Sequence, residues 1–167
     1  MIRKLVLNTL VERVAKARLI DQIIGSREDP YLLRWYVIPR NPIFNIYLHR
    51  FCRSDDDRAL HDHPWWNFSW LLEGDYREEV PADRADPAGE RRIILRSEGD
   101  MAFRFAKDSH RVLLYSYYSG QEIPVWTLFI TGPRFRKWGF WCPHSWRFWK
   151  DFTNNEDGVS EIGRGCD

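Results

Sequence analysis

The chain is poor in cysteine, with only Cys52, Cys142 and Cys166 among its 167 residues. An odd number of cysteines at such wide spacing predicts no disulfide framework, and no CxxC pair is present to bind zinc. We expect Cys52 and Cys142 to be buried, unreactive thiols, because no neighbour in the sequence would activate them. Cysteine usage of this kind favours a reducing, cytoplasmic compartment.

Long apolar runs and a strong net charge are also missing. No run of about 18 apolar residues occurs, so no transmembrane helix is predicted. The apolar N-terminal stretch carries charges and lacks a small-residue cleavage site, so we expect no signal peptide. With 25 basic and 24 acidic residues, the net charge of +1 argues against a dedicated nucleic-acid or anionic-membrane binder. We interpret the basic cluster Arg134–Lys137 as a solvated strand end.

Aromatic residues, in contrast, are abundant. They make up 16% of the chain and include nine Trp, and 44% of all residues are hydrophobic. A chain of 167 residues with this composition is most simply one domain with a substantial core. It contains neither a Gly-rich phosphate loop nor a GxSxG nucleophile elbow, which argues against the enzyme classes that depend on them.

Residues 1–29 differ in pattern from the rest of the chain. Apolar residues such as Leu7 and Leu10 recur at helical spacing and alternate with charged ones. This pattern predicts one amphipathic helix over Lys4–Ile24, which ends at Gly25 and packs on a core elsewhere in the chain.

Residues 30–150 show short runs rich in Val, Ile, Tyr, Phe and Trp, separated by turn residues. Pro81–Glu90, with two Pro and one Gly, is predicted to be a loop. Closely spaced strands favour an all-β barrel or sandwich. Residues 151–167 are acidic and poor in aromatics, which is typical of a mobile tail. The predicted strands are Trp35–Ile38, Phe44–Phe51, Asn67–Leu72, Tyr76–Val80, Arg91–Arg96, Met101–Phe105, Arg111–Tyr118, Val125–Thr131 and Lys137–Trp141.

Three histidines lie in strand-like surroundings. His61 and His63 are two residues apart, and side chains two apart in a strand point to the same face, while Asp62 points away. Asn67 has the same parity, and His110 must come from another strand. Three imidazoles from two segments can hold a divalent metal ion and leave its other positions open for water, dioxygen or substrate.

This spacing resembles the cupin family. The first cupin motif has HxH, three or four residues, an acidic residue, six residues and Gly, and His61–Gly74 follows this pattern. The second motif has a Gly and, eleven residues later, a His, which Gly99 and His110 match. The resemblance spans about residues 44–131. It implies a small RmlC-like double-stranded β-helix, a jelly-roll barrel with the N-terminal α-helix outside, in which the three histidines bind metal.

The chain departs from the family's motifs at several positions. Asp55 replaces the first Gly, Asn67 replaces the Glu ligand, and Phe105, Lys107 and Leu114 replace the Pro, Gly and Asn of the second motif. Three neutral imidazoles leave the charge of a divalent ion uncompensated, whereas a Glu would neutralise half of it. The more positive site favours an anionic, chelating partner such as a thiolate, carboxylate or enolate. Asn67 could be a weak oxygen ligand, orient a histidine, or satisfy strand-end hydrogen bonds.

Other residues near the motifs are candidates for substrate binding. Arg50 could face the barrel and pair with a substrate carboxylate, or form an outward salt bridge. By strand parity Trp65 could line the pocket while Trp66 covers the outside. His49 and His144 fall at no motif position, and we interpret them as structural.

Three-histidine iron sites are used by thiol-dioxygenase-like cupins. The resemblance therefore implies a non-haem Fe(II) oxygenase acting on a small anionic molecule, although Zn, Ni, Mn and Cu also suit imidazole ligands. The alternatives are a metal-dependent isomerase or epimerase acting on a sugar or keto acid, and a non-enzymatic ligand-binding module. We expect a small-molecule partner and no nucleic acid or membrane. The Trp-rich stretch Trp138–Trp149 could serve a homodimer interface or close the barrel.

Overall fold

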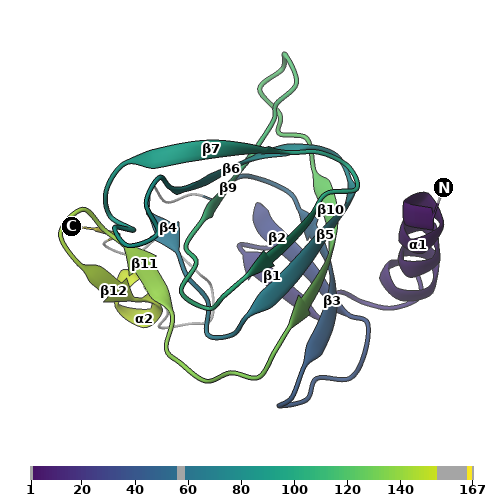
Figure 1. Cartoon of the computed structure of the whole chain (residues 1–167). Helices are drawn as coiled ribbons and strands as arrows, with labels where there is room; N and C mark the ends of the chain where they lie inside the picture. The colour runs from purple at the N-terminus through teal and green to yellow at the C-terminus, as the bar shows by residue number, and fades with distance from the viewer. Residues whose placement is uncertain (1, 56–58, 154–164, 167) are drawn as a thin grey trace.

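The computed structural model describes residues 2–55, 59–153 and 165–166. Strands make up most of its regular structure (Figure 1). None of the helices in these residues combines the length and apolar character needed to cross a membrane. The elements are α1 (Ile2–Leu10), the π-helix η1 (Val11–Ala15), β1 (Gln22–Gly25), β2 (Pro30–Tyr36), β3 (Asn45–Phe51), β4 (Leu60–His61), β5 (Asn67–Glu73), β6 (Tyr76–Pro81), β7 (Arg91–Arg96), β8 (Met101–Arg104), β9 (Arg111–Leu114), β10 (Val125–Thr131), β11 (Gly139–Trp141), β12 (Trp146–Phe148) and α2 (Trp149–Phe152).

The strands form a jelly-roll barrel. One sheet has the order β1-β2-β3-β10-β5-β8, and a second has the order β7-β6-β9. A third sheet has the order β12-β11-β4, and β4 is linked to the residue just before β9 by the antiparallel bridge between His61 and His110. The set β3-β10-β5-β8 therefore faces β4-β9-β6-β7, with the chain passing repeatedly from one set to the other. This order is that of a double-stranded β-helix, which confirms the predicted all-β jelly roll with an N-terminal α-helix.

The two faces of the six-stranded sheet have different roles. Along β3, His49 is buried on the inner face and Leu48 is buried on the outer one. The outer face packs under α1, which lies outside the barrel (Figure 1), in a cluster that joins Leu7 to Leu48. A separate interior cluster consists of Leu71, Tyr76, Val112, Leu114 and Val125. The helix therefore covers the outside of the sheet and leaves its inner face available for a site.

The N-terminal helix is shorter than the predicted Lys4–Ile24. The helical turns end at Ala15, and Gln22–Gly25 form β1, which pairs antiparallel with β2. The prediction is wrong here because Ile23 is β-branched and pairs across a hairpin, where sheet formation outweighs the helical pattern. Gly25 does not end a helix but has a φ of 97° at the hairpin turn, a conformation that favours glycine.

The predicted division of the chain after residues 29 and 150 stays a prediction. β2 begins directly after the first point, at Pro30, and α2 continues across the second. Of the predicted tail, residues 154–164 and 167 lie outside the described residues. The predicted loop between Pro81 and Arg91 is confirmed, since β6 ends at the first of these residues and β7 begins at the second.

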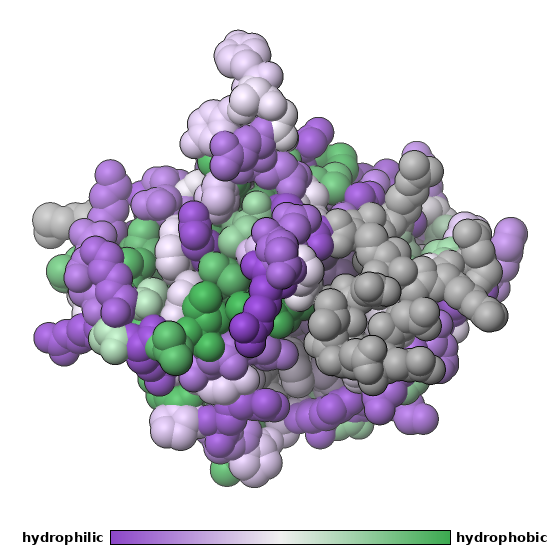
Figure 2. Space-filling model, turned by 180° about the vertical axis from the view of Figure 1, so that it is seen from behind, coloured by the Kyte–Doolittle hydropathy of each residue, from purple (hydrophilic) through white to green (hydrophobic). Residues whose placement is uncertain are grey.

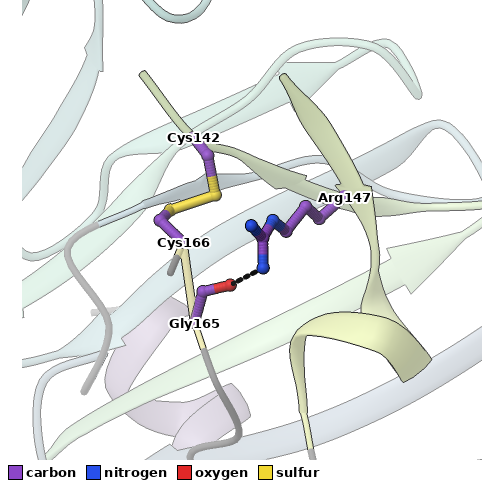
Figure 3. Close-up of a disulfide and its surroundings, with 4 residues drawn as sticks. All are labelled: Cys142, Arg147, Gly165 and Cys166. Carbon is purple, nitrogen blue, oxygen red and sulfur yellow. Dashed lines mark hydrogen bonds between the residues drawn. A yellow bond between two sulfur atoms is a disulfide. The ribbon is translucent and has the colours of Figure 1, made fainter. Parts of the chain in front are cut away.

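A disulfide joins Cys142, just after β11, to Cys166 near the C-terminus (Figure 3). The prediction of no disulfide is therefore wrong, because sequence spacing does not reveal that the fold brings the two Cα atoms within 5.4 Å. Beside the disulfide, Arg147 Nη1 donates a hydrogen bond of 3.1 Å to the Gly165 carbonyl oxygen (Figure 3). Cys52 is the free cysteine. Cysteine content consequently no longer argues for a reducing compartment.

The β9–β10 loop projects from the barrel, as both the ribbon (Figure 1) and the space-filling view (Figure 2) show. Its Tyr117 and Tyr118 are exposed. This projection keeps the loop away from the barrel interior, so the interior is enclosed by the strands and the C-terminal segment.

We predict that loss of the disulfide destabilises the fold. Cys166→Ser should lower the free energy of unfolding by about 3 kcal/mol, because the bridge closes a loop of 24 residues in the unfolded chain. Urea unfolding followed by circular dichroism measures the change. Reductant should destabilise the wild type and a Cys52→Ser control, and leave Cys166→Ser unaffected. Equal stability of wild type and Cys166→Ser under oxidising conditions would contradict the prediction.

Candidate metal centre

The structure brings His61, His63 and His110 together. His61 and His110 exchange two backbone hydrogen bonds of 3.0 Å, which places the two side chains next to each other. The ring centroid of His63 lies 5.2 Å from that of each of the other two rings. One ligand atom from each histidine lies within 4.8 Å of the others, and the cluster contains no carboxylate. The sequence-predicted ligand set is thus assembled from β4, the segment after it, and the residue before β9.

These three side chains fit a divalent metal ion. Burial, followed by the proximity of His61 and His110, holds the pKa of His63 well below its usual value. Burial and then the charge of Arg104 lower the pKa of His110 to about 4, although Glu78 opposes this shift. Both imidazoles are therefore neutral at pH 7, the form that binds metals. The Nε2 atoms of His63 and His110 are 3.0 Å apart. Two nitrogen ligands at about 2.1 Å from one ion and at right angles would show about this separation.

Glu78 contacts the Nδ1 side of the His110 ring. Its Oε1 lies 2.8 Å from His110 Nδ1, so the Nε2 atom is left facing the cluster. Glu78 is fully buried, and it accepts hydrogen bonds from Arg96, at 2.7 Å, and from Arg104. Burial alone would raise the pKa of Glu78, but the contacts with His110, Arg104 and Arg96 keep it well below its usual range. We did not predict Glu78 from the sequence. It lies two residues after Tyr76 on β6, and both side chains are buried on the same face of this strand. This spacing was the signal that could have identified it.

Asp62 points away from the cluster, as strand parity predicts, and is also fully buried. Its carboxylate accepts hydrogen bonds from Gly139 N at 2.8 Å, from Trp146 Nε1 at 3.1 Å and from Arg136 Nη2 at 3.0 Å. Arg136 Nη1 also donates to the His63 carbonyl oxygen at 2.9 Å. The interpretation of the Arg134–Lys137 cluster as a solvated strand end is therefore wrong for Arg136, which connects the HxH segment to the C-terminal segment.

The histidines line a cavity of about 430 Å³. Its volume lies within the range of small-molecule sites, which is about 300–1,000 Å³. Trp65 lines this cavity, whereas Trp66 stacks on Phe103 at a centroid distance of 5.9 Å. The C-terminal segment supplies Trp138, Phe140, Trp149 and Phe152 to the wall. The Trp-rich stretch therefore closes one side of the barrel, and its proposed role in a homodimer stays a prediction.

Two of the predicted candidates do not line this cavity. Arg50 follows inward-facing His49 and so lies on the outer face of β3, where its guanidinium is 5.8 Å from the Trp126 ring centroid. Asn67 is fully buried on β5, opposite Thr131 and Arg104 in the register. Neither polar atom of the Asn67 amide has a hydrogen-bond partner among the described residues.

The other two histidines lie in different environments. His144 is exposed in the turn before β12. His49 is buried and lines the cavity, so it belongs to the site although it matches no motif position. The signal that could have identified His49 was its inward parity on the strand that precedes the motif.

Comparisons with known proteins find no matching family model and no matching curated protein. Solved structures do match. Fe(II)-HppE with the alternative substrate (S)-1-HPP is 15% identical, with a TM-score of 0.47, over 70% of this chain and 60% of that one. A double-stranded β-helix protein from Klebsiella pneumoniae is 14% identical, with a TM-score of 0.47, over 71% and 89%. A Ralstonia eutropha protein described as a mannose-6-phosphate isomerase is 18% identical, with a TM-score of 0.47, over 68% and 92%.

We predict that the metal-free protein loses stability as the pH falls below neutrality. Burial lowers the pKa of His49, His63 and His110 in the folded chain, so on unfolding these groups take up protons below their usual value of 6.5. The free energy of unfolding should fall by up to about 1.4 kcal/mol per pH unit for each group. Urea unfolding between about pH 7.5 and about pH 5 measures the slope. His49→Gln should reduce it, and an unchanged slope in that variant would contradict the assignment to His49.

We also predict that Asp62→Asn destabilises the protein by about 3–5 kcal/mol, because it leaves the Arg136 charge without its buried partner. Thermal or urea unfolding measures the loss. The matched control is Glu73→Gln, since Glu73 is exposed and forms no ion pair within the described residues. A loss as small as that of the control would mean that the Asp62–Arg136 pair contributes little.

Proposed function

We propose that this protein binds one divalent metal ion through His61, His63 and His110 and acts as a mononuclear non-haem Fe(II) oxygenase, similar to thiol dioxygenases, on a small anionic molecule. The observation that carries this proposal is the convergence of three imidazole ligand atoms, without a carboxylate, on the wall of a cavity of about 430 Å³. A site with neutral ligands keeps the full charge of its ion and attracts an anionic substrate.

A bound Fe(II) ion would supply electron transfer to dioxygen and a template for the substrate. The residues of the chain would perform the other tasks. Glu78 would keep His110 in one orientation, and the aromatic wall of the C-terminal segment would exclude bulk water from the cavity. Trp65 would contact the substrate from the HxH side.

The oxygenase is favoured over a metal-dependent isomerase or epimerase because an isomerase needs a base in the cavity. Asp55 is the only carboxylate among the described residues that line it. Its Oδ2 atom already accepts a hydrogen bond of 2.7 Å from Val112 N and lies 3.8 Å from His61 Nδ1. A cytoplasmic location is not part of the proposal, because the Cys142–Cys166 disulfide removes the argument on which it rested.

We predict that the wild-type protein, reconstituted with Fe(II) or Co(II), retains about one metal ion per chain after desalting. The double variant His61→Ala/His110→Ala should retain almost none, because a single imidazole cannot hold the ion against dilution. Elemental analysis measures the metal content of the wild type and of each variant. The control is His144→Ala, which removes an exposed histidine and should bind metal like the wild type.

Less than about a tenth of an equivalent in the wild type would contradict the metal site itself. Metal retained in the double variant would contradict the ligand set. Oxygen uptake by the Fe(II) protein across small thiols and keto acids then tests the reaction class. Stable Zn or Mn binding with no oxygen consumed on any of these compounds would favour the isomerase or the non-enzymatic binding module.

A further inference from the structure

Arg34 lies in a polar row that crosses the inner face of the six-stranded sheet. In the strand register Arg34 is opposite Gln22 on β1 and opposite His49 on β3, and His49 is opposite Thr127 on β10. Arg34 Nε donates to His49 Nε2 at 2.8 Å, and Arg34 Nη1 donates to Gln22 Oε1 at 3.0 Å. Its guanidinium also lies 4.8 Å from the Tyr47 ring centroid. These contacts fix the guanidinium against the sheet.

Within the described residues the charge of Arg34 has no acidic counterpart. No carboxylate of these residues forms an ion pair with it, and both of its side-chain hydrogen bonds go to neutral acceptors. Burial is the main cause that lowers the pKa of Arg34. A guanidinium has five N–H donors, so three remain after these two bonds, enough for a bidentate contact with a carboxylate. A half-buried cation without a counter-charge is costly unless a ligand supplies one.

His49 positions Arg34 in the cavity wall. Because its Nε2 accepts the bond from Arg34, its proton must be on Nδ1, which is buried away from the cavity surface. Burial, and then the charge of Arg34, keep the pKa of His49 well below its usual value, so the ring is neutral and can accept this bond. The unused N–H groups of Arg34 therefore remain for a ligand in the cavity.

This pair shares a cavity with the metal centre. Both residues line the same space as the three metal-site histidines. The Phe129 ring lies between the two groups, with its centroid 5.0 Å from that of His49 and 6.3 Å from that of His63. One small molecule in this cavity can therefore contact both Arg34 and the metal-site histidines.

The charge of the cavity wall indicates how many negative charges the ligand carries. The charged side chains among the described residues of the wall, apart from histidines, are Arg34, Arg53 and Asp55. Arg53 lies 3.2 Å from the Asp29 carboxylate, and Asp55 lies 3.8 Å from His61 Nδ1. Within the described residues, Arg34 is therefore the cation of this wall without an acidic partner. One uncompensated charge matches a single carboxylate rather than a dianionic phosphate.

We propose that Arg34, assisted by His49, is a carboxylate-binding subsite separate from the metal-binding histidines. The inference rests on the proposed function for the metal end of the cavity. It specifies the substrate class as a small carboxylic acid that carries a second, metal-binding group, such as a thiol or hydroxyl, and an apolar chain that packs on Phe129. Arg34 is thus a specificity-determining residue that the sequence motifs do not reveal.

The test uses the Co(II)-loaded full chain and two thiols, 3-mercaptopropanoate and 2-mercaptoethanol, with binding followed by the visible absorption of cobalt. Arg34→Met should weaken the binding of 3-mercaptopropanoate about tenfold or more, because it removes a charged bidentate contact. The binding of 2-mercaptoethanol, which lacks the carboxylate, should stay unchanged. Arg34→Lys keeps the charge and should recover part of the loss. Arg50→Met is the matched control, since Arg50 lies on the outer face over Trp126.

A second measurement separates the subsite from the metal centre. In the metal-free protein, butanoate should shift the NMR signals of residues around Arg34, butanamide should not, and Arg34→Met should abolish the shift. Loss of cobalt binding with the butanoate response retained would overturn the proposed function and leave the subsite standing. Cobalt binding with equal affinity of wild type and Arg34→Met for 3-mercaptopropanoate, within about twofold, would overturn the subsite alone.

Discussion

The buried carboxylate of Asp62 is the contact on which the site depends. It accepts hydrogen bonds from Gly139 N, Trp146 Nε1 and Arg136. Through Arg136, whose guanidinium also donates to the carbonyl oxygens of His63 and Ala106, the same carboxylate fixes the backbone beside the metal-site histidines. The residue between the two histidines of the HxH motif therefore positions both the ligands and the segment that forms the cavity wall. A charged hydrogen-bond network of this kind is rigid only when every member is satisfied, as it is here.

Glu78 lies on β6, in the same strand set as β4, and its buried carboxylate has a role like that of Asp62. Each carboxylate is fully buried and paired with arginine, so its charge is used inside the scaffold and is not available as a metal ligand. His63 and His110 stay neutral, because burial lowers the pKa of both, that of His110 to about 4 even though Glu78 lies beside it. The charges of Asp62 and Glu78 are thus used in contacts within the scaffold, while the charge of Arg34 lies in the cavity wall.

Parity and motif spacing were sufficient to predict His61, His63 and His110, because both are local properties of the sequence. Parity could place Glu78 on an inner face, but neither property could predict the contacts of Glu78 or Arg34, which depend on the neighbours that register and topology give them across the sheet. The same reason explains the short strands β1, β4 and β12, which are set by pairing partners rather than by their own composition. The disulfide was missed because its two cysteines meet only after the C-terminal segment folds back over the barrel.

The same arrangement of charges explains why position 67 carries an amide and not a carboxylate. Asn67 lies opposite Arg104 in the register of β5 and β8, and Arg104 already donates to Glu78. A carboxylate at position 67 would compete with Glu78 for this arginine, and the competition would weaken the contact that orients His110. An uncharged side chain leaves Arg104 committed to Glu78 and leaves the metal position without an anionic protein ligand. The departure from the resembled motif is therefore coupled to Glu78, because the amide at position 67 leaves the contact between Arg104 and Glu78 undisturbed.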